Sequence, residues 1–334
     1  MRVRSWSGAT GITIKAMANL NPITVTVVVP SHNPDLGRLR ETLLGLKLQS
    51  LAPELWEVLL VDNASSAFPH ESDYAASAPP GLRVIREPRL GLTSARLAGI
   101  RASRGSAIVF VDDDNVLASN YIEEVARIFA KEPRIGAAGG KSVPVFEIPP
   151  EAWHEEFLPL LALRDLGDSE QVADNFRPDG STKNQYPSCA PIGAGMALRR
   201  EAALVWAESI EHDPRRFGFD RSGAALVSGG DNDIVMALLE AGWSVGYFPS
   251  LSLRHLIPGA RLELGYLARL NRAIQRSWVQ VLAVHQANPW PPIPRWTVPL
   301  RNGKAFVKLR AWASPQNRVR WHGACGRNEG RASI

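Results

Sequence analysis

The sequence predicts an α/β fold in which the first part of the chain forms a doubly wound unit around a parallel sheet. Short runs of β-branched and apolar residues alternate with segments of helical character through about the first 115 of the 334 residues. Polar side chains directly follow three of these runs. Because ligands of open α/β sheets bind at the carboxyl ends of the strands, these polar turns are expected to meet in one crevice.

The elements of this unit follow one another without long interruptions. Residues 23–30 are expected to form a buried parallel strand, because almost all of them are apolar or β-branched. A short polar loop follows, and leucines from position 36 onward indicate the first helix. The remaining elements of the unit are strands at residues 56–61, 83–86 and 107–111 and a helix that begins at position 92, after Gly91.

The second half of the chain is less regular. Residues 144–190 are rich in Pro, Glu and Asp and show little periodicity, which favours a long excursion over the site. A helix over residues 234–241 is expected to follow an acidic N-terminus and to stop at Gly242. The other elements expected here are a helix at 199–210, strands at 243–248 and 251–253, and an amphipathic helix at about 262–284 before a tail rich in Pro, Trp and Arg.

Composition limits the class of protein. With 45% apolar and 21% charged residues the chain is typical of globular proteins, and no apolar stretch approaches the roughly 20 residues of a membrane-spanning helix. The two cysteines, Cys189 and Cys325, lie far apart without metal-type partners, which argues against a disulfide scaffold and a zinc site and favours a reducing cytoplasm. The loop after the first strand has neither Gly nor Lys, which excludes a dinucleotide dehydrogenase and a nucleotidyltransferase.

The net charge of +5 is unevenly distributed. From Arg301 to the end, eight Lys or Arg residues accompany one Glu, and four of the ten tryptophans lie in or near this segment. Basic residues with tryptophan suit an anionic membrane surface, and they also suit a nucleic acid. A solvated basic tail is the third alternative.

Three consecutive aspartates, Asp112, Asp113 and Asp114, follow the strand at 107–111. Neighbouring carboxylates repel one another, and each raises the pKa of the next. A divalent cation removes this penalty, and oxygen-rich clusters suit Mg²⁺ or Mn²⁺. The alternative is a solvated turn, in which Asn115 is a further turn-forming residue. The position of the cluster at a strand end, next to two other polar strand ends, favours a ligand site.

Five segments, in this order, resemble the motifs of family 2 glycosyltransferases. The resemblance covers roughly residues 23–260. It implies a GT-A fold, with a Rossmann-like nucleotide-binding half, a mixed central sheet and an acceptor-binding second half. It also implies inverting transfer of a sugar from a nucleotide-sugar. The segments are VVPSHN at 28–33, LVDNAS at 60–65, EPRLGLTSAR at 87–96, FVDDD at 110–114 and GGDND at 229–233.

The resemblance assigns donor binding to residues of the first half. It implies that Asp112 faces the nucleoside and that Asp114 holds a Mg²⁺ or Mn²⁺ ion, while Asp113 either binds the nucleotide or only shapes the loop. For two arginines in this half, a surface ion pair is the alternative role. The other residues expected to bind the nucleotide are Pro30, Ser31, Asn33 and Asp62, with Arg89 and Arg96 as partners of the diphosphate.

The resemblance also implies a catalytic base and a further metal ligand. The base is Asp231, and Asp233 competes for the role because this sequence has Gly230 where many relatives have glutamate. The alternative for both aspartates is that they only stabilise a helix N-terminus, by about 0.3–1 kcal/mol each. His255 is expected to complete the metal or phosphate shell, and a structural role is its alternative.

The same resemblance divides the chain. Residues 21–260 are expected to form the GT-A catalytic domain, with a nucleotide-binding half at 21–115 and an acceptor half at 116–260. Residues 1–20 are expected to be disordered, or translation is expected to start at Met17. Residues 261–334 are expected to form a helical extension rich in Trp and Arg.

These features together indicate an inverting hexosyltransferase. It would move a sugar from a nucleotide-sugar, with a UDP-sugar as the commonest donor of the family, to a glycan or lipid-linked acceptor in cell-surface or exopolysaccharide biosynthesis. We expect a cytoplasmic location, peripheral contact with the anionic inner face of the cytoplasmic membrane, and no nucleic-acid partner. The competing hypothesis is a non-catalytic nucleotide- or glycan-binding protein of GT-A fold with a basic docking tail.

Overall fold

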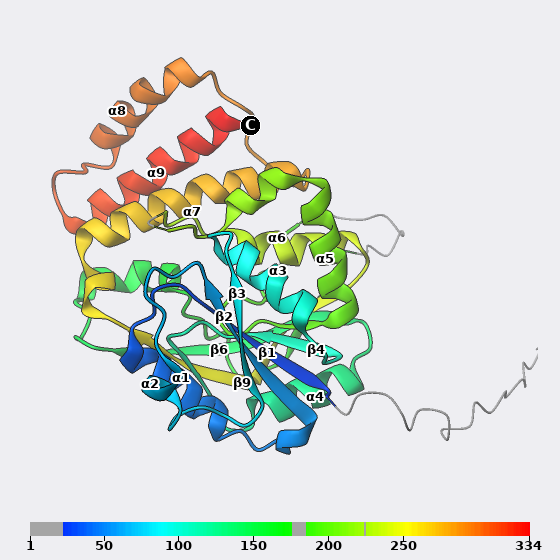
Figure 1. Ribbon diagram of the computed structural model, residues 1–334. Coiled ribbons are helices and arrows are strands. Elements are labelled where there is room, and N and C mark those ends of the chain that lie inside the picture. The colour runs from blue at the N-terminus through cyan, green and yellow to red at the C-terminus, as the bar shows by residue number, and fades with distance from the viewer. Residues whose placement is uncertain (1–22, 176–184, 224) are drawn as a thin grey trace, which may run out of the picture.

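The computed structural model describes residues 23–175, 185–223 and 225–334. The expectations for residues 1–20 lie outside this range. Within it, nine strands form one mixed sheet in the order β3-β2-β1-β4-β8-β6-β9-β5, with β7 joined to β9 (Figure 1). The mixed α/β fold predicted from the sequence is therefore confirmed.

The first half of the sheet is parallel, as predicted. β1 (Val25–Ser31) lies between β2 (Trp56–Asn63) and β4 (Ala107–Phe110), and β3 (Leu82–Glu87) extends the sheet beyond β2. Every residue of β1, β2 and β4 is buried, because helices cover both faces of the sheet, and this explains the continuous apolar runs in the sequence. The register places the carboxyl ends of β1 and β2 side by side.

The second half contains both strand directions. Short β8 is antiparallel to both β4 and β6, whereas β6 and β9 run parallel to each other. β5 pairs antiparallel with β9, so that Asn115 lies opposite His255. This pairing brings His255 next to the end of β4, where the three aspartates lie. The strands are β5 (Asn115–Leu117), β6 (Ile135–Phe146), β7 (Gln171–Ala173), β8 (Ala197–Arg199) and β9 (Ser244–Ile257).

Helices pack on both faces of the sheet (Figure 1). Val27 and Val29 of β1 belong to the core beneath α1 and α4, whereas Val28 belongs to the opposite core beneath α3, α5 and α6. Gly99 permits this second contact, because a Cβ there would lie 2.3 Å from a methyl group of Val28. The helices of this layer structure are α1 (Leu36–Lys47), α2 (Glu71–Tyr74), α3 (Leu92–Ala102), α4 (Tyr121–Lys131), α5 (Arg200–His212) and α6 (Gly230–Glu240).

Three more helices form the C-terminal part of the chain. α9 (Pro315–Ser333) packs along α7 (Leu264–Val284), and α8 (Val298–Lys308) lies at the outer edge of the molecule (Figure 1). The contact between α7 and α9 is close, because a Cβ at Gly326 would lie 2.0 Å from the carbonyl oxygen of Arg272. None of the helices in the described ranges combines the length and hydropathy of a bilayer-spanning segment.

The structure adds elements that the sequence pattern did not predict. They are α2, α4, β5, β6, β7 and β8, and the two strands expected at 243–253 are one continuous strand, β9. The described part of the 144–190 excursion contains the end of β6, a 3₁₀ segment at Ala152–Leu161 and β7. The 3₁₀ segment contains Pro159 and does not have the α-helical period, but its Phe157 and Leu161 are buried against α7.

Candidate active site

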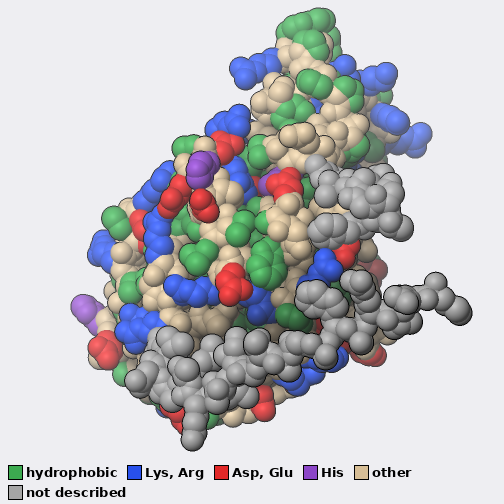
Figure 2. All heavy atoms as spheres, turned by 90° about the vertical axis from the view of Figure 1, so that its right-hand side faces the viewer, with side chains coloured by type: hydrophobic (Ala, Val, Ile, Leu, Met, Phe, Trp, Pro, Cys, Tyr) green, Lys and Arg blue, Asp and Glu red, His purple; other side chains and the backbone are tan. Residues whose placement is uncertain are grey.

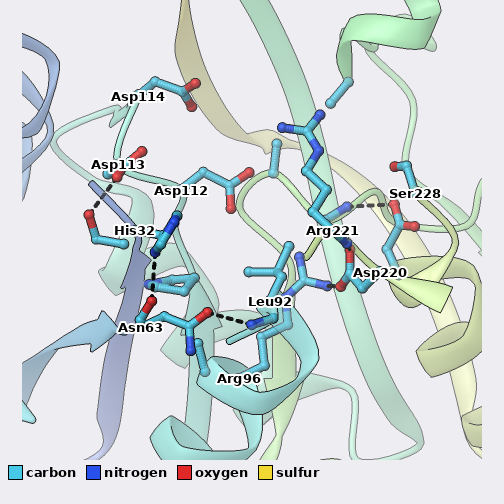
Figure 3. Close-up of a pocket in the computed structure, with 18 of the residues that line it drawn as sticks. His32, Asn63, Leu92, Arg96, Asp112, Asp113, Asp114, Asp220, Arg221 and Ser228 are labelled. Atoms are coloured by element: carbon cyan, nitrogen blue, oxygen red, sulfur yellow. Dashed lines mark hydrogen bonds and ion pairs between the residues drawn. The ribbon is translucent and has the colours of Figure 1, made fainter. Parts of the chain in front are cut away.

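A cleft of about 260 Å³ lies at the carboxyl ends of the central strands (Figure 3). Its wall includes the end of β1, the turn after β4, the start of α3 and the first turn of α6. The predicted meeting of the polar strand ends is thus confirmed for the ends of β1, β2 and β4. The lining includes the sequence-predicted residues Pro30, Ser31, Arg96, Asp112, Asp113, Asp114, Asp231 and His255.

The three aspartates have different partners. The carboxylate of Asp113 accepts a hydrogen bond of 2.5 Å from the hydroxyl of Ser31. Asp114 is buried, and its Oδ2 accepts a hydrogen bond of 2.7 Å from Arg261 while its Oδ1 lies 3.3 Å from Nε2 of His255. Asp112 faces the cavity, and the side chain of Arg221 extends into the cavity from the other side (Figure 3).

Burial and mutual repulsion set the protonation of this cluster. Burial, followed by the charge of Asp114, raises the pKa of Asp112, and the same two causes raise the pKa of Asp113 to about 7. Burial alone would raise the pKa of Asp114 as well. The hydrogen bond from His255 and the charges of His255 and Arg261 outweigh it and hold the pKa of Asp114 well below its usual range. Asp114 is therefore the carboxylate that stays charged.

The donor set of this cluster suits a hard divalent cation. Carboxylate oxygens and an imidazole nitrogen are acceptable ligands for Mn²⁺, and carboxylates for Mg²⁺. Nδ1 of His255 and Oδ1 of Asn115 are buried and have no hydrogen-bond partner among the described residues. Within the same residues, no three His, Cys, Asp or Glu side chains form a ready-made ligand group. The cluster fits a metal chemically, but Arg261 occupies one oxygen of Asp114.

A buried ion pair forms part of the wall of the cleft. Nη1 of Arg96 donates a hydrogen bond of 2.8 Å to Oδ2 of Asp220, and both side chains are almost completely buried. Burial raises the pKa of Asp220, although the charge of Arg96 opposes the shift. Arg96 and Arg221 place two guanidinium groups opposite the aspartates, and Asp220 balances the charge of Arg96. Such groups suit the phosphates of a nucleotide.

Asp231 lies in the cleft at the start of α6. Its Oδ2 accepts a hydrogen bond of 3.0 Å from the backbone N–H of Gly193, and its Oδ1 accepts one of 2.9 Å from the N–H of Asn232. Gly230 before it packs directly on Asp220, because a Cβ at position 230 would lie 2.2 Å from Oδ2 of Asp220. Gly230 is thus a packing requirement of this chain.

Asp233 lies away from the cleft, and both of its carboxylate oxygens are already occupied by hydrogen bonds. Its carboxylate accepts two hydrogen bonds of 2.8 Å from Arg216 and one of 2.9 Å from the indole N–H of Trp206. His285 completes the network at 3.0 Å. Asp233 is 1% exposed, so no acceptor hydroxyl can reach it. The geometry therefore favours Asp231 over Asp233 as the base.

Three other predicted nucleotide ligands do not line the cleft. Asp62 is buried, and its Oδ1 accepts a hydrogen bond of 3.0 Å from the N–H of Ser65. Asn33 has a left-handed backbone, with φ of 48°, and its side chain accepts a hydrogen bond from the N–H of Ser66. The guanidinium of Arg89 stacks 3.6 Å above the centre of the Phe217 ring. These residues shape the loops around the cleft.

Sequence reasoning missed several residues that line the cleft. Arg261 lies in the short 3₁₀ segment Gly259–Leu262 after β9, and Asp220 and Arg221 lie in a segment without periodicity, so the sequence pattern did not indicate them. Asn63 could have been found, because it follows Asp62 at a predicted strand end. Its side chain holds the loop before α3 by accepting a hydrogen bond of 2.8 Å from the N–H of Gly91. The missed residues are His32, Asn63, Asp220, Arg221 and Arg261.

The fold and this cleft define a mixed α/β protein with a polar ligand cleft at the carboxyl ends of its strands, and comparison with known families identifies the family. Residues 26–204 match the model of glycosyl transferase family 2, which is more than half of the chain. The chain belongs to this family, and the resemblance found in the sequence is confirmed.

Curated relatives carry related names. An N-acetylglucosaminyltransferase of Sinorhizobium fredii is 32% identical over 72% of this chain and 54% of its own length. One of Bradyrhizobium elkanii is 33% identical over 36% of this chain and 66% of its own length. The chain thus spans about half to two thirds of these relatives. Among solved structures, S. aureus TarS residues 1–349, in complex with UDP, covers 92% of this chain and 89% of its own with 13% identity and a TM-score of 0.48.

Proposed function

We propose that this protein is an inverting glycosyltransferase that moves a sugar from a nucleotide-sugar to a hydroxyl group of a glycan or lipid-linked acceptor. The observation that supports it most is the position of Asp231. Its carboxylate opens into the same cleft as Asp112 and Asp114 and is oriented by the N–H of Gly193. A base and a leaving-group site therefore share one cavity, as a single displacement requires.

In the proposed reaction Asp231 takes the proton of the acceptor hydroxyl. The acceptor oxygen forms a bond to the anomeric carbon as the bond from that carbon to the phosphate oxygen breaks, and the nucleoside diphosphate leaves with the bonding electrons. Inversion follows because attack and departure occur on opposite faces. Arg96 and Arg221 stabilise the growing negative charge of the diphosphate, since both line the cleft opposite the aspartates.

Asp114 and His255 are the residues that would hold a divalent cation, while Asp112 would face the nucleotide. When bound, Mg²⁺ or Mn²⁺ offsets the charge of the departing diphosphate as a Lewis acid. Family membership supports this assignment, because divalent metals are common among these enzymes. Pro30, Ser31 and Asn63 form the neighbouring wall, where a nucleoside fits between the ends of β1 and β2.

The names of the relatives support an N-acetylhexosamine donor, and we propose a UDP-sugar of that class. We also propose that residues 21–115 form the nucleotide-binding half, that 116–260 form the acceptor half, and that 261–334 form an extension. Arg261, at the start of that extension, lines the cleft, so the extension takes part in the donor site.

Transfer assays test the proposal. UDP-, dTDP- and GDP-sugars are offered with and without Mn²⁺ to the full-length chain, with glycan oligomers as acceptors. Mn²⁺-dependent transfer with inverted anomeric configuration is the expected result. Tight nucleotide binding that ignores Mn²⁺, with no transfer from any donor, would instead favour a non-catalytic binding protein.

A further inference from the structure

Helix α8 presents two different faces. One packs on α9, where Phe306 contacts the ring of Trp321 at 5.2 Å between centroids and the carbonyl of Asn302 accepts a hydrogen bond of 3.0 Å from the indole N–H of Trp321. No residue of α8 is fully buried. The helix is therefore held from one side only, and its other side faces outward at the edge of the molecule (Figure 1).

The outward face carries large apolar side chains. Trp296, in the turn before α8, is 74% exposed, Leu300 is 69% exposed and Val307 is 63% exposed. At 3.6 residues per turn, Leu300 and Val307 lie on one side of α8, and Trp296 belongs to the 3₁₀ segment Arg295–Thr297 directly before the helix. Trp312, just after α8, is 62% exposed. We call Trp296, Leu300 and Val307 the α8 stripe. Such a row of exposed apolar groups indicates a contact surface.

Basic residues flank the α8 stripe. Arg301, Lys304 and Lys308 follow one another at helical spacing on one side of it and are exposed. Lys304 and Lys308 form no ion pair within the described residues. From position 285 to the end the sequence has a single acidic residue, Glu329, which is bound to Arg272 of α7. Figure 2 shows hydrophobic and basic side chains together over this C-terminal part at the top of the molecule.

We propose that the α8 stripe and its basic flank dock on the surface of an anionic lipid bilayer. Tryptophan is favoured at the level of the lipid headgroups, where its ring is half in apolar surroundings, and leucine and valine reach into the acyl region. Lys and Arg beside them attract anionic headgroups. A shallow contact of this kind needs no spanning helix.

A bilayer fits these side chains better than other occupants. A nucleic acid would use the cations but would leave Leu300 and Val307 in water. A second copy of the chain would bring two basic flanks together, which costs free energy by repulsion of like charges. An anionic membrane satisfies the apolar stripe and the cations at once.

Docking would also fix the orientation of the cleft. α8 is held by α9, and α9 packs closely along α7, which begins three residues after Arg261 of the cleft. The cleft and the docking surface thus belong to one packed body. This inference stands independently of the proposed reaction, because it rests only on the surface of α8.

Co-sedimentation with vesicles tests the proposal on the full-length chain. Vesicles of neutral phosphatidylcholine are compared with vesicles containing phosphatidylglycerol, at low and high salt. We expect binding to anionic vesicles at least about tenfold above neutral ones, and loss of most of it in high salt because exposed charges are screened. Binding to neither kind of vesicle, or equal binding to both, would overturn the proposal.

Two variants and a matched control identify the surface. W296S/L300S/V307S removes the stripe, and R301E/K304E/K308E reverses the flank. L48S/K131E changes an exposed leucine and an exposed lysine elsewhere. We expect at least about tenfold weaker vesicle binding for the first two and wild-type binding for the third. The proposal is overturned if the stripe variant binds vesicles as strongly as the wild type. It is also overturned if the wild-type protein is a dimer and the stripe variant is a monomer.

Contact depth is measured by quenching with brominated lipids. We expect quenching of tryptophan fluorescence in the wild type and its marked reduction in W296F/W312F, whereas equal quenching would contradict the assignment. Circular dichroism verifies that each variant is folded. Nucleotide-sugar binding in solution is measured in parallel. A wild-type protein that binds vesicles but no nucleotide-sugar counts against the proposed function alone. A wild-type protein that binds a nucleotide-sugar but no vesicles counts against docking alone.

Discussion

Arg261 and Asp114 form an ion pair of 2.7 Å inside the cleft, although 147 residues separate them in the sequence. The second amino group of the same guanidinium lies 3.1 Å from Nε2 of His255. One arginine therefore contacts both residues that are best suited to a metal. A cation that binds Asp114 has to share its carboxylate with Arg261 or displace the guanidinium, so donor and metal binding are expected to be coupled to a rotation of this side chain.

Replacement of Asp114 tests the metal assignment. We expect Asp114→Ala to abolish Mn²⁺-dependent binding of a nucleotide-sugar, because it removes the one carboxylate of the cluster that is held in its charged form. Titration calorimetry with UDP-N-acetylglucosamine, with and without Mn²⁺, measures this. Asp168→Ala, at a surface ion pair with Lys141, is the matched control and should bind as the wild type. Metal-dependent binding that survives in Asp114→Ala would exclude Asp114 as the ligand.

The two aspartates at the start of α6 should behave differently when each is changed to asparagine. Asp231→Asn should bind donor normally and lose transfer by about 10²–10⁴-fold, as removal of a general base does. Asp233→Asn should instead lower the free energy of unfolding by about 3–5 kcal/mol, because it breaks the buried pair with Arg216. Steady-state kinetics and urea unfolding measure the two effects. Equal loss of turnover in both folded variants would contradict this division.

Gly230 should resist even the smallest side chain. The Cβ of Gly230→Ala would meet the carboxylate of Asp220, which cannot retreat because Arg96 holds it. We expect a loss of about 1–3 kcal/mol in the free energy of unfolding, typical of overpacking. Gly303→Ala in α8, where nothing lies within 4 Å of the new Cβ, is the control and should be neutral or stabilising. Thermal unfolding of both variants decides the matter, and a stable Gly230→Ala protein would show that Asp220 can move.

Stability should depend on pH through His285. Burial lowers the pKa of His285, but the hydrogen bonds to Asp233 and Glu240 raise it more, so the net shift is upward from 6.5. A raised pKa means that protonated His285 stabilises the fold fully below about pH 6.5 and that this contribution is lost as the pH rises through the folded-state value. Urea unfolding between pH 5.5 and 9 should show a smaller loss in His285→Gln than in the wild type. If the free energy of unfolding depends on pH identically in the two proteins, His285 is not the group responsible.

The strand ends could be predicted from the sequence because two local rules agree there. Buried parallel strands are continuously apolar, and their carboxyl ends meet at one edge, so the pattern of residues alone assigns Ser31 and Asp112 to one crevice. Asp62 shows the limit of the rule. Its strand end is in the right place, but its carboxylate closes its own loop through Ser65 instead of facing the cleft.

The choice between Asp231 and Asp233 could not be made from spacing alone. Residues two apart on a helix point about 200° apart, so only one of them can face the cleft, and the sequence does not say which. The answer depends on Arg216, Trp206 and His285, which come from three separate segments. Arg261 was missed for a similar reason, because only the pairing of β5 with β9 brings its turn to Asp114.

The close contact of α9 with α7 also has a consequence for how the protein is made. The backbone of α9 touches that of α7 at Gly326, where even one extra carbon would collide with Arg272. During synthesis α7 appears before α9, so its outer surface has no cover until the later helix emerges. A chain interrupted between the two helices would expose that surface to chaperones and proteases. Loss of α9 should therefore lower the cellular abundance of the protein more than the catalytic rate of each folded molecule.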